Sequence, residues 1–110
     1  CREIVAAALA DAPYGWGMVA YTDPGARLTF SIRDELRRVT EETGRRPAAI
    51  FMQNHGLIVH ADDPDECLRI HTDVNGRIAA AFGLSGDSFP PVAVREIGDG
   101  LVEADSPYLS

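Results

Sequence analysis

The sequence contains no lysine, only two cysteines, and no apolar run of the length that crosses a membrane. Its 17 acidic side chains outnumber ten basic ones, all arginine, so the formal net charge is −7. Binding of phosphates requires clustered basic side chains, and this balance therefore argues against nucleic acid or an anionic membrane as the main partner. Without lysine, this segment has no amine for Schiff-base chemistry. Cys1 and Cys67 match neither a disulfide framework nor zinc-finger spacing, so we expect a reducing, cytoplasmic compartment.

The arginines come partly in pairs, Arg37-Arg38 and Arg45-Arg46, around the predicted end of a helix. Cations at this position complement the negative end of the helix dipole. A patch that binds anions is the alternative function for the same residues.

Hydrophobic periodicity predicts alternating helices and strands within one domain spanning residues 1–110. Helices are predicted over residues 3–10, 26–43 and 64–82, strands over 18–21, 48–53 and 57–61, and a hairpin over 92–103. The strands predicted over 48–53 and 57–61 are joined by so short a connection that they must be antiparallel. The expected fold is therefore an α/β class fold, a layered α/β/α sandwich around a mixed or antiparallel sheet.

One segment places a polar turn between two apolar strands. Asn54-His55-Gly56, which we call the corner, interrupts the apolar residues of 49–59. A glycine here permits a positive φ, so the His55 imidazole can point into a cleft instead of the core. An imidazole at a strand end can ligate a metal or transfer a proton. The simpler alternative is that His55 hydrogen-bonds a loop carbonyl.

The order of these segments resembles the C-terminal half of class II aldolase/adducin domains. The resemblance rests on Tyr21-Thr22-Asp23-Pro24-Gly25, the long helix after it, the run from Phe51 to Val59 and the helix start Asp63-Pro64-Asp65-Glu66. It covers residues 17–84, and Asn-His-Gly-Leu-Ile is its most specific part. The family includes fuculose-phosphate and rhamnulose-phosphate aldolases and ribulose-phosphate 4-epimerase. The resemblance implies that residues 1–110 are the C-terminal portion of a longer domain that forms ring-shaped homotetramers.

By this resemblance, His55 is one of three imidazoles on a divalent metal, normally zinc. The family's other two lie upstream in a His-x-His pair, together with a catalytic glutamate and a phosphate-binding loop, and this sequence has no His-x-His. His60 and His71 are expected to be surface or packing residues. A catalytic zinc needs about three protein ligands, so we expect the chain alone to bind zinc weakly and to be inactive.

The implied activity is that of a metal-dependent lyase. It would cleave or form a carbon–carbon bond in a small sugar phosphate or related keto compound, through an enediolate stabilised by the metal. Asn54 is a candidate for hydrogen bonding beside the ligand, or simply a turn former, and Tyr21 and Asp23 could line the same cleft. Two alternatives stay open: a same-fold epimerase or decarboxylase, and a non-catalytic, adducin-like assembly module.

Overall fold

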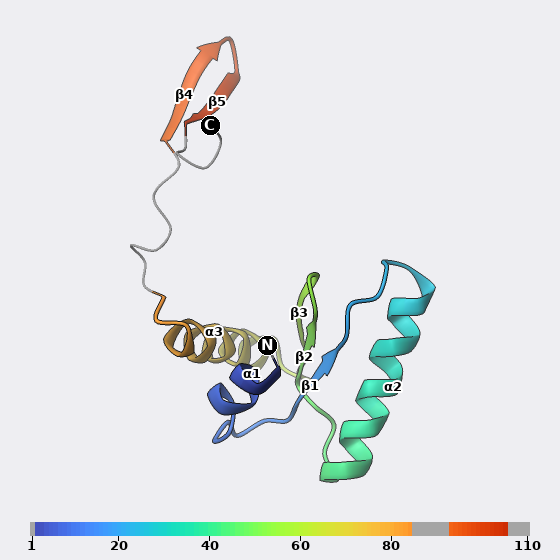
Figure 1. The fold of residues 1–110 in the computed structure, drawn as a ribbon. Helices are drawn as coiled ribbons and strands as arrows, with labels where there is room; N and C mark the ends of the chain where they lie inside the picture. The colour runs from blue at the N-terminus through green and yellow to red at the C-terminus, as the bar shows by residue number, and fades with distance from the viewer. Residues whose placement is uncertain (1, 85–92, 106–110) are drawn as a thin grey trace.

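A computed structural model describes residues 2–84 and 93–105, which form three helices and five strands (Figure 1). The helices are α1 (Arg2–Ala8), α2 (Ala26–Thr43) and α3 (Pro64–Ala81), and the strands are β1 (Trp16–Val19), β2 (Ala49–Met52), β3 (Gly56–Val59), β4 (Ala93–Gly98) and β5 (Leu101–Asp105). The predicted α/β class is confirmed. No helix among the described residues is both long enough and apolar enough to span a membrane.

The first three strands form one mixed sheet with the order β1-β2-β3. Strand β1 runs parallel to β2, with Trp16 opposite Ala49, and β2 runs antiparallel to β3, with Ala49 opposite Val59. The antiparallel pair agrees with the prediction from the short connection. Of the two predicted sheet types, the mixed one is present.

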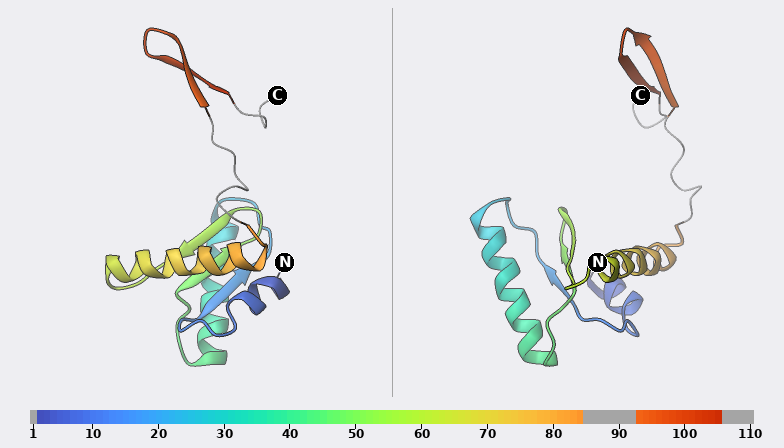
Figure 2. Two further views of the ribbon diagram at one scale, coloured as in Figure 1. Left: turned by 90° about the vertical axis from the view of Figure 1, so that its left-hand side faces the viewer. Right: turned by 180° about the vertical axis from the view of Figure 1, so that it is seen from behind.

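Helices cover both faces of this sheet because β2 is apolar on both sides. On one face, Ile50 packs with Val19 of β1 and Leu28 of α2. On the other face, Ala49 packs with Ile70 and Val74 of α3. Figure 2 shows α2 on one side of the sheet and α1 and α3 on the other. Successive residues of a strand point to opposite faces, so this single short strand contributes to two cores.

The ends of α2 and α3 follow from local sequence. Asp63 caps α3 by accepting a hydrogen bond from the Glu66 N–H at 2.9 Å, and Pro64 occupies the first turn. Gly44 ends α2 in the left-handed conformation, with a φ of 71°, and its N–H donates to the Thr40 carbonyl. Helix α2 spans the predicted residues, and α3 ends one residue before its predicted limit.

The first helix and strand differ from their predicted bounds. The helix predicted over residues 3–10 ends at Ala8 and continues only as a turn, and the strand predicted over 18–21 lies at Trp16–Val19. Strands β2 and β3 are each shorter than predicted. The difference at β1 has a physical reason in Gly17. Glycine has a low β-strand propensity, but β1 includes it because the neighbouring side chains leave little room for a Cβ there.

The predicted hairpin is present as β4 and β5, with Val94 opposite Ala104. Gly100, with a φ of 74°, lies in the turn, and every described side chain of β4 is exposed. Val92, where the hairpin was predicted to begin, lies outside the described residues.

Strand β1 is fixed to α2 by the carboxylate of Glu35, whose side chain is only 10% exposed. Glu35 Oε1 accepts a hydrogen bond from the Met18 N–H at 2.9 Å, and the guanidinium of Arg38 donates to both carboxylate oxygens, at 2.7 and 2.8 Å. Arg2 from α1 lies 3.7 Å from the same carboxylate. A Cβ at Gly17 would lie 2.9 Å from Glu35 Cγ and 2.9 Å from Ile50 Cδ1. A side chain at position 17 would therefore force Glu35 or Ile50 to move.

We expect Gly17→Ala to destabilise the fold by about 1–3 kcal/mol, the usual effect of overpacking, because both neighbours are held by other contacts. Gly76→Ala is the matched control: Gly76 lies inside α3, and a Cβ there would meet nothing within 4 Å. This control should be neutral or stabilising by up to about 1 kcal/mol, from helix propensity. Urea denaturation measures both. Equal midpoints for the two variants would contradict the proposed contact.

The pKa of Glu35 is lowered, first by the hydrogen bonds from Arg38 and then by the Met18 N–H and the charges of Arg38 and Arg2, with burial opposing. A carboxyl whose pKa is lowered by folding stabilises the protein above its unfolded pKa, and this contribution is lost as pH falls through the folded pKa. Glu35→Gln should therefore lower stability at pH 7 and have less effect near pH 3. Urea denaturation at both values tests this, with Glu41→Gln, at an exposed position of the same helix, as control. A Glu35→Gln effect independent of pH would contradict it.

Candidate functional site

The corner lies at the end of β2, where the chain leaves the sheet and turns back into β3. Asn54 has a φ of 58° and Gly56 a φ of 150°, so the residues on both sides of His55 have positive φ. The His55 N–H donates to the Met52 carbonyl at 3.0 Å. His55 itself is exposed and belongs to neither core. The sequence predicted the turn, and it allowed for the positive φ that Gly56 adopts.

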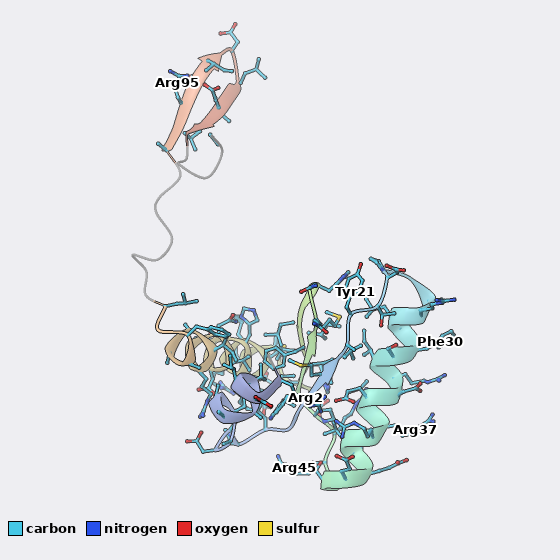
Figure 3. The ribbon with its side chains drawn as sticks, viewed as in Figure 1. Arg2, Tyr21, Phe30, Arg37, Arg45 and Arg95 are labelled. Carbon is cyan, nitrogen blue, oxygen red and sulfur yellow. The ribbon has the colours of Figure 1, made fainter. Side chains whose placement is uncertain are left out.

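Tyr21 lies at the same end of the sheet as the corner. Strands β1 and β2 are parallel, so the residues that follow them emerge side by side. Gln53 joins the two segments: its N–H donates to the Val19 carbonyl at 3.0 Å, and its side-chain oxygen accepts from the Tyr21 N–H at 3.2 Å. Figure 3 places Tyr21 close to the tip of the turn between β2 and β3. Sequence reasoning singled out Tyr21 but missed Gln53, the residue that positions it.

Tyr21 is 56% exposed, and its hydroxyl donates to Asp23 Oδ1 at 3.2 Å. Asn54 is also exposed. Tyr21, Asn54 and His55 thus form an open, polar surface at one end of the sheet. The chemical groups available there are an imidazole, an amide and a phenol.

The described residues do not complete a metal site by themselves. No three of their histidine, cysteine, aspartate and glutamate side chains come close enough together to hold an ion. His60 lies at the other end of β3, where its Nε2 donates to the Pro47 carbonyl at 2.6 Å, and His71 is exposed on α3 beside Asn75. A zinc at His55 would need about two further protein ligands from outside these residues.

A cavity of about 700 Å³ lies at the opposite end of the sheet from the corner. It is bounded by the loop before β1, the loop between α2 and β2, the end of β3 and the first turns of α3. Tyr14 and His60 contribute to its lining. The sequence carried one signal for it, the Arg45-Arg46 pair.

Tyr14 ties the loop before β1 to α3. Its hydroxyl donates to Asp73 Oδ2 at 2.7 Å, and Arg77 Nε donates to the same oxygen at 2.7 Å. Burial, followed by the hydrogen bond to Asp73, raises the pKa of Tyr14 to about 12. The phenol therefore stays protonated and keeps donating throughout the neutral range.

We expect His55→Ala to change the free energy of unfolding by no more than about 0.5 kcal/mol, because an exposed turn residue contributes few packing contacts. Asn54→Ala should cost about 1 kcal/mol or more, because alanine tolerates the left-handed conformation less well than asparagine. Asn54→Gly is the control that restores this freedom. Denaturation midpoints measure all three. Strong destabilisation by His55→Ala would instead identify His55 as a core residue.

No family model, curated protein or solved structure was found to match this chain. The resemblance to class II aldolase/adducin domains therefore rests on the quoted motifs alone.

Proposed function

We propose that this chain is the C-terminal part of a class II aldolase/adducin-like domain, with the layered sandwich of that family. In this proposal His55 is one imidazole ligand of a divalent metal, normally zinc. The protein would act as a lyase on a carbon–carbon bond of a small sugar phosphate or keto compound. The observation that supports it most is the exposed His55, held between two positive-φ residues at the end of a buried strand.

The geometry of the corner favours a ligand over a structural histidine. Among the described residues the His55 ring has no hydrogen-bond partner, whereas the rings of His60 and His71 lie within hydrogen-bond distance of other groups. The backbone of His55 is anchored to Met52, and β2 packs into both cores. A ligand needs such fixed positioning of its backbone together with a free ring nitrogen.

When bound, the metal would polarise the carbonyl of a ketose-like substrate and stabilise the negative charge that develops as the carbon–carbon bond breaks. Of this chain's residues, Tyr21 and Asn54 would bind substrate hydroxyls beside His55. The hydrogen bond from the Tyr21 hydroxyl to Asp23 would orient the phenol in that role. Two further imidazoles, a general acid or base and the phosphate site would come from a preceding segment, and active sites would form in a homotetramer.

The test uses the protein encoded by the complete reading frame that contains this sequence. Purified wild type should hold about one zinc or other divalent ion per chain and cleave a ketose 1-phosphate, with removal by a chelator abolishing both. His55→Ala should lose the metal and the activity. His71→Ala is the matched control, an exposed histidine on α3, and should keep both. Elemental analysis and a coupled aldehyde assay give the two readouts.

The alternatives give different results in the same experiment. Metal bound through His55 with epimerisation or decarboxylation, but no cleavage, would replace the lyase by a same-fold enzyme. A complete protein that assembles but holds no metal would indicate the adducin-like role. Full metal content in His55→Ala would overturn the proposal. The 110-residue chain alone should retain no zinc after dialysis, because one imidazole leaves the ion under-coordinated.

A further inference from the structure

The cavity opposite the corner has a cationic wall. Arg45 and Arg46, in the loop after α2, and Arg69, on α3, all line it. Within residues 2–84 and 93–105, neither Arg45 nor Arg46 lies in an ion pair, and Arg69 is 4.0 Å from its nearest carboxylate, on Asp63. Two guanidinium groups without a carboxylate partner among these residues are notable in a chain with a net charge of −7.

The role first predicted for the Arg45-Arg46 pair, stabilisation of a helix end, has little structural support. The last turn of α2 contains no basic residue, and both arginines lie beyond Gly44, which ends the helix. The interaction of a charge with the helix dipole weakens beyond the terminal turn. Arg45 also approaches the Pro13 carbonyl, at 3.5 Å, across the rim of the cavity.

The rest of the cavity wall is fixed by contacts that do not involve these arginines. Asp73 accepts hydrogen bonds from Tyr14 and Arg77, and Arg77 also pairs with Asp11 at 2.6 Å. These bonds compensate the charge of Asp73. His60 is held by the Pro47 carbonyl. The walls are therefore positioned before any ligand binds.

Two further carboxylates, of Asp62 and Glu66, line the same cavity. They can accept hydrogen bonds from hydroxyl or amine groups. A bare inorganic anion would satisfy only the arginines, and a purely apolar ligand would satisfy neither set. The lining thus favours a small molecule with an anionic end and a polar, hydrogen-donating end.

We propose that this cavity binds a small organic anion. Its phosphate or carboxylate group lies against Arg45, Arg46 and Arg69, and its hydroxyl or amine groups face Asp62 and Glu66. Guanidinium groups recognise both oxyanions through paired N–H donors. The inference is independent of the function proposed for His55.

Amide chemical shifts of the 110-residue chain, followed by NMR at constant ionic strength, test the proposal. The probes are glycerol 3-phosphate for a phosphate group, malate for carboxylates and glycerol as the uncharged control. We expect saturable shifts in residues 14–15, 45–46, 48 and 60–62 with at least one anion and none with glycerol. The tighter of the two anions identifies the preferred group.

Arg46→Gln and Arg69→Gln, on two walls of the cavity, should each weaken binding about tenfold, the effect of losing one charge-assisted hydrogen bond. Arg27→Gln removes the same charge from an exposed position of α2 away from the cavity and should leave binding unchanged. All three substitutions are at exposed positions, so we expect the variants to fold. NMR spectra of the free variants that match the wild-type spectrum will confirm this. Equal weakening by Arg27→Gln, shifts that do not saturate, or shifts centred on residues 54–56 would each overturn the proposal.

Discussion

The arrangement of α1, β1 and α2 depends on one nearly buried carboxylate, that of Glu35. It accepts a hydrogen bond from the Met18 N–H, where a carbonyl of another strand would otherwise accept, and so satisfies this donor at the outer edge of β1 in the described sheet. Arg38 and Arg2 balance its charge, which makes burial of the carboxylate tolerable. The carboxylate can reach this position only because Gly17 has no side chain.

Strand β2 imposes the second constraint. Its alternate residues enter the cores under α2 and α3, so the strand cannot slip by one position without exchanging Ile50 and Ala49 between two differently shaped sites. Fixed in this way, β2 also fixes what lies beyond each end. One end leads into the corner with His55, and the other begins at the loop that carries Arg46.

Much of the fold could be predicted because its signals are local. Gly25 and Gly44 bracket α2, and Asp63 with Pro64 begins α3, so these helices lie within a residue of the predicted bounds. The bounds of β1 could not be predicted, because the reason for Gly17 in a strand is a contact with Glu35, 18 positions along the chain. The hydrophobic pattern likewise could not predict that β1 pairs with β2 in parallel, since either strand direction buries the same residues.

The two candidate sites also differ in whether their signals are local in the sequence. The corner is one continuous segment, so its turn and the exposure of His55 follow from Asn54 and Gly56, and only the bridge from Gln53 to Tyr21 needed the structure. The cavity is built by contacts between distant residues: Tyr14 with Asp73, 59 positions apart, and Asp11 with Arg77, 66 apart. In the sequence, only the Arg45-Arg46 pair points to this site. The structure adds the second signal: within residues 2–84 and 93–105, neither arginine of this pair has a carboxylate partner, whereas Arg77 pairs with both Asp11 and Asp73.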